Sequence, residues 1–129
     1  MTGAPLTALV VDDTPVNVKL IVALLKANGF AVTIATTGEA ALDLVRGADF
    51  RLMLLDLRLP GIDGLTVART VRADPHHRVL VIVAVTASAM KTDVAAALEA
   101  GCDAFVSKPI NTRTLIPMLM DLLSRGRQP

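Results

Sequence analysis

The sequence predicts an α/β fold of three layers, in which a five-stranded parallel sheet lies between helices. One observation is a pattern that occurs five times: a short apolar run, a turn, and a longer stretch with helical spacing. Another is the composition, since 129 residues with 53% hydrophobic and 19% charged side chains suit one aliphatic core. We therefore expect a single domain over residues 1–129, with its core at about 6–123 and no output domain.

The expected strands and helices alternate along the whole chain. The strands are Leu6–Val11, Ala31–Ala35, Arg51–Leu55, Val79–Val85 and Ala104–Val106. The five helices are about Pro15–Asn28, Gly38–Arg46, Gly64–Arg72, Met90–Ala100 and Asn111–Ser124. The first, third and fourth strands are apolar almost throughout, which indicates burial on both faces, whereas the second alternates and the fifth is short. The strand order 2-1-3-4-5 meets these requirements and is the doubly wound order of flavodoxin-like proteins.

Capping residues support the limits of these helices. Thr14 before Pro15 is typical of an N-cap followed by proline at the first helical position. Three glycines are expected to close helices in the left-handed conformation: Gly29, Gly47 and Gly101. Pro117 would break a helix that starts at Asn111, so the last helix either starts nearer Thr114 or is kinked.

Composition argues against several classes of protein. The net charge of +1 comes from scattered charges, so a nucleic-acid partner is not expected. The longest apolar run, Val79–Val85, is too short to span a membrane, and no signal peptide is evident, so we expect a cytoplasmic protein. Cys102 is expected to be a small buried hydrophobe in a loop, and His76 and His77 to be solvated loop residues.

Polar side chains follow four of the five expected strands. They are, in chain order, Asp12, Asp13, Asp56, Thr86, Ser107 and Lys108. Each alone has an ordinary explanation as a helix cap, a turn residue or a solvated lysine. Because doubly wound sheets bind ligands where the carboxyl ends of their strands meet, the combination predicts one functional site at that edge.

The carboxylates of this group predict a metal ion. Three carboxylates a few ångströms apart repel one another, and the cluster is stable only around a cation. Oxygen ligands without histidine or thiolate favour a hard ion, and Mg²⁺ in particular, which retains several waters. We therefore expect Asp12, Asp13 and Asp56 to bind Mg²⁺ and to leave a coordination position for a phosphate oxygen.

The remaining polar groups predict phosphoryl transfer. Thr86 can donate a hydrogen bond and Lys108 a positive charge to phosphate oxygens, and this chemistry depends mainly on positioning and charge neutralisation. Asp56, the central carboxylate, is ionised near neutral pH and can attack without a general base. No glycine-rich phosphate loop occurs, so the phosphoryl donor is expected to be a small molecule or another protein.

Four segments resemble the receiver domains of two-component response regulators. They are VVDDTPVN, LLDLRLPGIDG, VTASAM and SKPI, and the resemblance covers about Leu6 to Leu123. The segments TASAMKTD, GCDAFVSKPI and NTRTL are similar to the stand-alone, DivK-like cell-division regulators and to receivers of hybrid kinases. The resemblance implies a CheY-like fold that signals and is not a turnover enzyme.

The family implies a role for each matching metal-site residue. Asp56 would be the phosphorylation site, Asp13 a direct ligand of Mg²⁺, and Asp12 a ligand mainly through water. The backbone carbonyl of Arg58 would be a further ligand, and Mn²⁺ would be a substitute for Mg²⁺. Arg58 and Ser88 occupy positions that tune the lifetime of the phosphoryl group in such proteins.

The family also implies the phosphoryl contacts, the partners and a switch. Thr86 and Lys108 would contact the phosphoryl group, and the Lys108–Pro109 peptide bond would be cis. The donor would be a sensor histidine kinase or a histidine phosphotransfer protein, and the output would be a downstream protein target. Phe105 falls at the switch position: Thr86 would move toward the phosphoryl group and Phe105 would fill the vacated space. The alternative is that Phe105 is ordinary core of an edge strand.

The last expected helix has more apolar residues than one core-facing stripe needs. They are Leu115, Ile116, Met118, Leu119, Met120, Leu122 and Leu123. We expect the surplus to form a docking or dimer surface with the neighbouring helix Met90–Ala100 and strand Ala104–Val106. The protein would be a monomer or a phosphorylation-dependent dimer.

Three other functions compete with this interpretation. A haloacid-dehalogenase-type phosphatase requires an aspartate two residues after its nucleophile, where this chain has Arg58, and it requires a cap domain. A flavodoxin-like electron carrier would need aromatic stacking, and the sequence has no Trp or Tyr. A degenerate receiver would bind partners without phosphorylation, yet all the acidic and phosphate-contacting positions are present.

Overall fold

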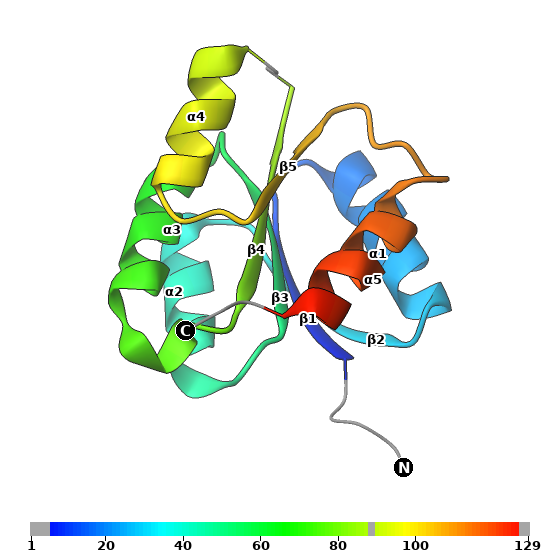
Figure 1. Ribbon diagram of the computed structural model, residues 1–129, viewed down its shortest axis with the longest axis horizontal. Coiled ribbons are helices and arrows are strands. Elements are labelled where there is room, and N and C mark those ends of the chain that lie inside the picture. The colour runs from blue at the N-terminus through cyan, green and yellow to red at the C-terminus, as the bar shows by residue number, and fades with distance from the viewer. Residues whose placement is uncertain (1–5, 88–89, 127–129) are drawn as a thin grey trace.

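The fold is known from a computed structural model that describes residues 6–87 and 90–126, so Ser88 lies outside the described residues (Figure 1). Five parallel strands form one sheet in the order β2-β1-β3-β4-β5. The strands are β1 (Leu6–Val11), β2 (Phe30–Ala35), β3 (Leu52–Asp56), β4 (Val81–Thr86) and β5 (Ala104–Ser107). The helices are α1 (Pro15–Ala27), α2 (Gly38–Gly47), α3 (Gly64–Ala73), α4 (Lys91–Glu99) and α5 (Leu115–Arg125), with a short 3₁₀ helix η1 (Pro75–His77) before β4. The predicted fold class and strand order are confirmed.

Each face of the sheet carries its own hydrophobic core. Helices α2, α3 and α4 cover one face, and α1 and α5 cover the other (Figure 1). Because side chains alternate along a strand, neighbours in β1 enter different cores: Leu9 packs under α2, α3 and α4, and Val10 under α1 and α5. The central strands β3 and β4 are buried along their whole length, as their continuous apolar sequences predict.

The segment that leads into β4 differs from its prediction. The strand begins at Val81, and Val79 is 63% exposed because the preceding turn continues to Leu80, whose N–H donates to the His77 carbonyl. His76 is exposed as expected, but the solvated position predicted for His77 is wrong. The η1 turn places the His77 ring at a small cavity between α2 and α3, where it is buried.

The helix ends follow the predicted capping residues in part. Helix α1 begins at Pro15 as predicted, but its N-cap residue Thr14 makes no side-chain cap hydrogen bond. Gly29 and Gly101 have φ angles of 89° and 109°, so both adopt the predicted left-handed region. The same prediction is wrong for Gly47, which is the last residue of α2 and is followed by an extended Ala48. The predicted start near Thr114 is confirmed, because helix α5 begins at Leu115 and holds Pro117 in its first turn.

Two further features of the described residues bear on function. Cys102 is buried as expected, and burial raises the pKa of its thiol to about 11. No helix in the described ranges has the length and apolar character needed to cross a membrane.

Asp63 caps α3, and its removal should destabilise the protein. Its carboxylate accepts a hydrogen bond from Thr66 N at 2.8 Å, and that bond lowers the pKa of Asp63. Asp63→Ala should cost about 1 kcal/mol of unfolding free energy, measured by urea unfolding at neutral pH. A lowered folded pKa means that this contribution is present above the ordinary Asp pKa and is lost as pH falls through the folded value. Asp63→Asn retains an acceptor and should lose less, and an Asp63→Ala cost that stays constant into acid would contradict the assignment.

Candidate functional site

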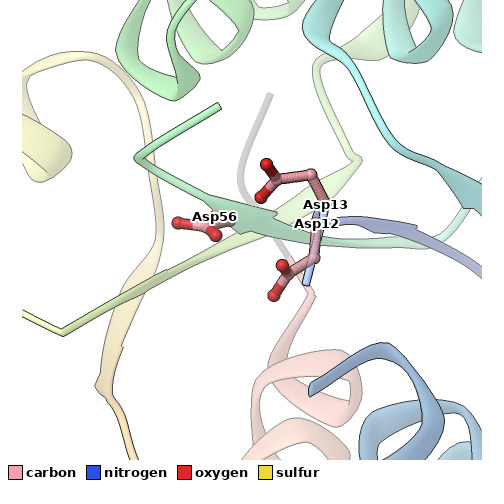
Figure 2. A group of neighbouring side chains, drawn as sticks. All are labelled: Asp12, Asp13 and Asp56. Atoms are coloured by element: carbon pink, nitrogen blue, oxygen red, sulfur yellow. The ribbon is translucent and has the colours of Figure 1, made fainter. Parts of the chain in front are cut away.

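Three acidic side chains meet at the carboxyl edge of the sheet. Asp12 and Asp13 directly follow β1, and Asp56 is the last residue of β3. These strands are neighbours, with Val11 opposite Leu55, so their ends deliver the carboxylates to one place. Figure 2 shows the side chains of Asp12 and Asp13 pointing toward the side on which Asp56 lies. One carboxylate oxygen of each residue lies within 4.8 Å of the others.

Backbone groups fix two of the three carboxylates. Thr14 N donates to Asp12 Oδ1 at 2.8 Å, and Arg58 N donates to Asp56 Oδ1 at 2.9 Å. Asp12 is 2% exposed and Asp56 is 4% exposed, whereas Asp13 is exposed to solvent. The cluster therefore has a buried, oriented side and an open side on which an ion can enter.

Lys108 brings a positive charge from the end of β5 into this cluster. Its Nζ lies 3.0 Å from Asp56 Oδ2 and 3.6 Å from Asp12 Oδ2. Its backbone N–H donates to the Thr86 carbonyl at 2.8 Å, and the following bond to Pro109 is cis, as expected. Thr86, the last residue of β4, is buried beside this pair of strand ends.

The electrostatics of the cluster fit a cation. Burial and the nearby charge of Asp56 raise the pKa of Asp12, which outweighs the lowering by Thr14 N–H and by Lys108. Asp12 Oδ2 is a buried side-chain oxygen without a hydrogen-bond partner in the described part of the protein. A cation would satisfy this buried acceptor, and oxygen-only donors suit a hard divalent ion such as Mg²⁺.

Mg²⁺ should therefore stabilise the fold, and Asp12→Asn should reduce that effect. At a Mg²⁺ concentration 100 times its Kd, the gain in unfolding free energy should be about 2.7 kcal/mol. Asp12→Asn should lose more than half of this gain, and in EDTA it should be more stable than wild type because one of three repelling carboxylates is neutral. Urea unfolding with EDTA or with Mg²⁺ measures both effects. The matched control is Asp43→Asn, which changes an exposed carboxylate on α2, and an undiminished Mg²⁺ response in Asp12→Asn would contradict the assignment.

Two predicted residues lie near the cluster without joining it. Phe105 is partly buried, lies opposite Ala84 in the sheet, and packs against the core under α2, α3 and α4. Ser107 is exposed at the end of β5. The switch role of Phe105 stays a prediction.

Sequence reasoning missed the part that Gly64 plays behind Asp56. A Cβ atom at Gly64 would lie 2.5 Å from the Asp56 carbonyl oxygen and 2.7 Å from Leu57 Cα. Gly64 N donates to the Leu57 carbonyl at 3.2 Å, so α3 starts directly against the backbone that carries Asp56. Its place in the segment LPGIDG was the only sequence signal for this contact.

Comparisons with known proteins agree with this geometry. Residues 8–120 match the sequence profile described as the response regulator receiver domain. The polar-differentiation response regulator DivK of Brucella anthropi is 35% identical over 119 residues, which span 92% of this chain and 97% of that protein. A CheY-like receiver domain protein from Methanospirillum hungatei has a TM-score of 0.87 at 26% identity, covering 95% of this chain and 96% of that one. The receiver domain of a sensor histidine kinase from Pseudomonas aeruginosa, solved with magnesium in its active-site cleft, has a TM-score of 0.86 at 32% identity, covering 94% and 99%.

Proposed function

Because the chain belongs to the response regulator receiver domain family, we propose that Asp56 accepts a phosphoryl group from a phosphohistidine on a partner protein. The partner is a sensor histidine kinase or a histidine phosphotransfer protein. Receiver domains are signalling domains and do not turn over an external substrate. The protein acts in the cytoplasm, in the same compartment as its phosphoryl donor.

The observation that carries this proposal is the contact between Lys108 and Asp56. Lys108 Nζ lies 3.0 Å from Asp56 Oδ2, and both side chains are largely buried. The ion pair with Lys108 orients the Asp56 carboxylate, as a nucleophile requires. The cation remains available for the charge that a phosphoryl group brings.

Mg²⁺ fits the acidic side of the same site, with Mn²⁺ as a substitute. Asp12, Asp13 and Asp56 would hold the ion, Asp12 mainly through water, together with the backbone carbonyl of Arg58. When bound, the ion neutralises phosphoryl oxygens. The exposure of Asp13 leaves an open side toward which the donor can approach.

Three residues of this chain, Asp56, Lys108 and Thr86, perform the phosphoryl transfer. A carboxylate oxygen of Asp56 attacks phosphorus in line with the bond to the donor's imidazole nitrogen, so the P–N bond breaks as the O–P bond forms. The imidazole leaves with the electron pair of the broken bond. Lys108 and the hydroxyl of Thr86 bind the equatorial phosphoryl oxygens, where the negative charge is spread.

The output is a contact with a downstream protein at the face formed by α4, β5 and α5. A groove of about 380 Å³ between β5 and α5 is lined in part by Phe105, Pro109 and Met118. Movement of Thr86 toward the phosphoryl group would let Phe105 shift inward and change this face. Met120 on α5 is 40% exposed and adds apolar surface, which a downstream partner or, in a phosphorylation-dependent dimer, a second copy would cover.

Incubation with acetyl phosphate and Mg²⁺, followed by intact-mass measurement, tests the proposed function. Wild type should gain one phosphoryl group, and it should gain none in EDTA. Asp56→Asn should gain none under either condition, whereas the control Asp43→Asn should behave as wild type. A mass gain that persists in Asp56→Asn would refute the assignment of the acceptor.

A further inference from the structure

A buried ion pair lies at the amino-terminal edge of the sheet, at the opposite end of the strands from Asp56. Arg72 on α3 and Asp103, the residue before β5, meet at 2.6 Å between Nη2 and Oδ2. Their side chains are only 10% and 15% exposed. A largely buried ion pair is costly unless further hydrogen bonds stabilise it.

The guanidinium group of Arg72 donates to two further groups. Its Nε donates to the Gly101 carbonyl at 2.8 Å, and its Nη1 donates to the His77 carbonyl at 3.0 Å. A Cβ atom at Gly101 would collide with the Arg72 side chain, so the turn between α4 and β5 fits closely around it. Arg72 thereby fixes the position from which Asp103 enters the sheet.

Asp103 in turn binds Ile82 of β4 twice. Its backbone N–H donates to the Ile82 carbonyl at 2.7 Å, and its Oδ2 accepts from Ile82 N at 2.9 Å. These two bonds set where β5 starts along β4. We call Arg72, Asp103 and Ile82 the clamp.

The clamp and the phosphoryl contacts lie at opposite ends of the same two strands. From the clamp, the pairing continues through Ala84 opposite Phe105 to Thr86 opposite Ser107, and Lys108 follows. Strand β5 is at the edge and pairs only with β4, so its position along β4 depends on this ladder. The three carboxylates come from β1 and β3 and do not depend on it.

We propose that Arg72 and Asp103 are positioning residues for phosphoryl transfer. By holding β5 in register with β4, the clamp places Lys108 Nζ within 3.0 Å of Asp56. The proposal rests on the proposed function and adds to it a remote determinant of the phosphoryl half of the site. It separates two properties of that site: loss of the clamp lowers the phosphoryl affinity and does not lower the Mg²⁺ affinity.

The test measures both affinities in folded variants. Asp103→Ala removes the acceptor for Ile82 N and the partner of Arg72, whereas Asp103→Asn keeps an acceptor for Ile82 N. Asp103→Ala should weaken beryllofluoride binding and slow acetyl phosphate phosphorylation about tenfold, because small displacements of a catalytic group are costly. Its Kd for Mg²⁺, from isothermal titration calorimetry, should not rise, since the carboxylate ligands follow other strands and a displaced Lys108 would compete less with the ion for them. Asp103→Asn should recover most of the loss, and Asp43→Ala, which breaks an exposed ion pair, should match wild type.

Wild-type beryllofluoride affinity in folded Asp103→Ala, or an equal loss of Mg²⁺ and beryllofluoride affinity, overturns the proposal. If Asp103→Ala does not fold, Arg72→Lys takes its place, because lysine keeps the charge but lacks the planar set of donors by which Arg72 reaches Asp103, Gly101 and His77. Arg72→Lys should show the same selective loss of beryllofluoride affinity, and its absence overturns the proposal. If wild type with Mg²⁺ fails to bind beryllofluoride at all, the proposed function itself fails.

Discussion

Replacing Lys108 with alanine should slow the phosphorylation of Asp56 by acetyl phosphate about a hundredfold or more. The reason is the loss of a fixed positive charge that faces the phosphoryl oxygens in a largely buried site. The time course of the intact mass measures the rate, with Mg²⁺ in excess for every variant. Lys26→Ala, at the exposed end of α1, removes a lysine of the same kind far from the site and should leave the rate unchanged.

The same substitution should raise the affinity for Mg²⁺. Lys108 Nζ lies 3.0 Å from Asp56 and 3.6 Å from Asp12, so it competes with a cation for the same carboxylates. Isothermal titration calorimetry should therefore show tighter Mg²⁺ binding in Lys108→Ala, in the opposite direction to the phosphorylation rate. A variant that is phosphorylated at the wild-type rate would remove Lys108 from the mechanism.

The second large effect is expected from Gly64→Ala, which should cost about 3 kcal/mol of unfolding free energy. The new methyl group would lie 2.5 Å from the Asp56 carbonyl oxygen and 2.7 Å from Leu57 Cα. Both are backbone atoms in or next to a buried strand, so neither can turn aside as a flexible side chain can. Urea unfolding with EDTA measures the loss without a contribution from bound metal.

Gly47→Ala is the matched control for this substitution. A Cβ atom at Gly47 meets nothing within 4 Å, and this glycine ends α2 without a positive φ angle. Alanine there should stabilise the protein by about 0.5 to 1 kcal/mol, because it restricts the unfolded chain and favours the helix. If Gly64→Ala were as stable as this control, the loop after β3 would have to be far more adaptable than its contacts indicate.

Most residues of the candidate site could be predicted from the sequence, because the ends of apolar strands are easily recognised. Asp12, Asp13, Asp56 and Lys108 each follow or end an apolar run, and parallel strands bring such positions to one edge. Even where a boundary differs by a residue, the side chain stays at that edge. Asp56 therefore lies at the predicted edge of the sheet, although β3 ends one residue later than predicted.

Contacts between distant segments could not be predicted in this way. Nothing in the spacing of Arg72 and Asp103 indicates that they pair, since one lies on a helix and the other before a strand 31 residues later. The burial of His77 likewise depends on a short turn packed between two helices, while its neighbours Pro75 and His76 are typical of a surface loop. Such features depend on packing in three dimensions, which periodicity along one chain does not record.

The existence of two separate cores has a consequence for how such a protein can be remodelled. Leu9 and Val10 are adjacent in β1, yet each belongs to the core of a different helical layer. A repacking substitution on one layer can therefore influence the other only through the backbone of the shared strands. The solvent-facing residues of α1 and α5 could accordingly be replaced by those of another protein to change which partner binds. The layer of α2, α3 and α4 and the carboxyl ends of the strands would keep their native arrangement.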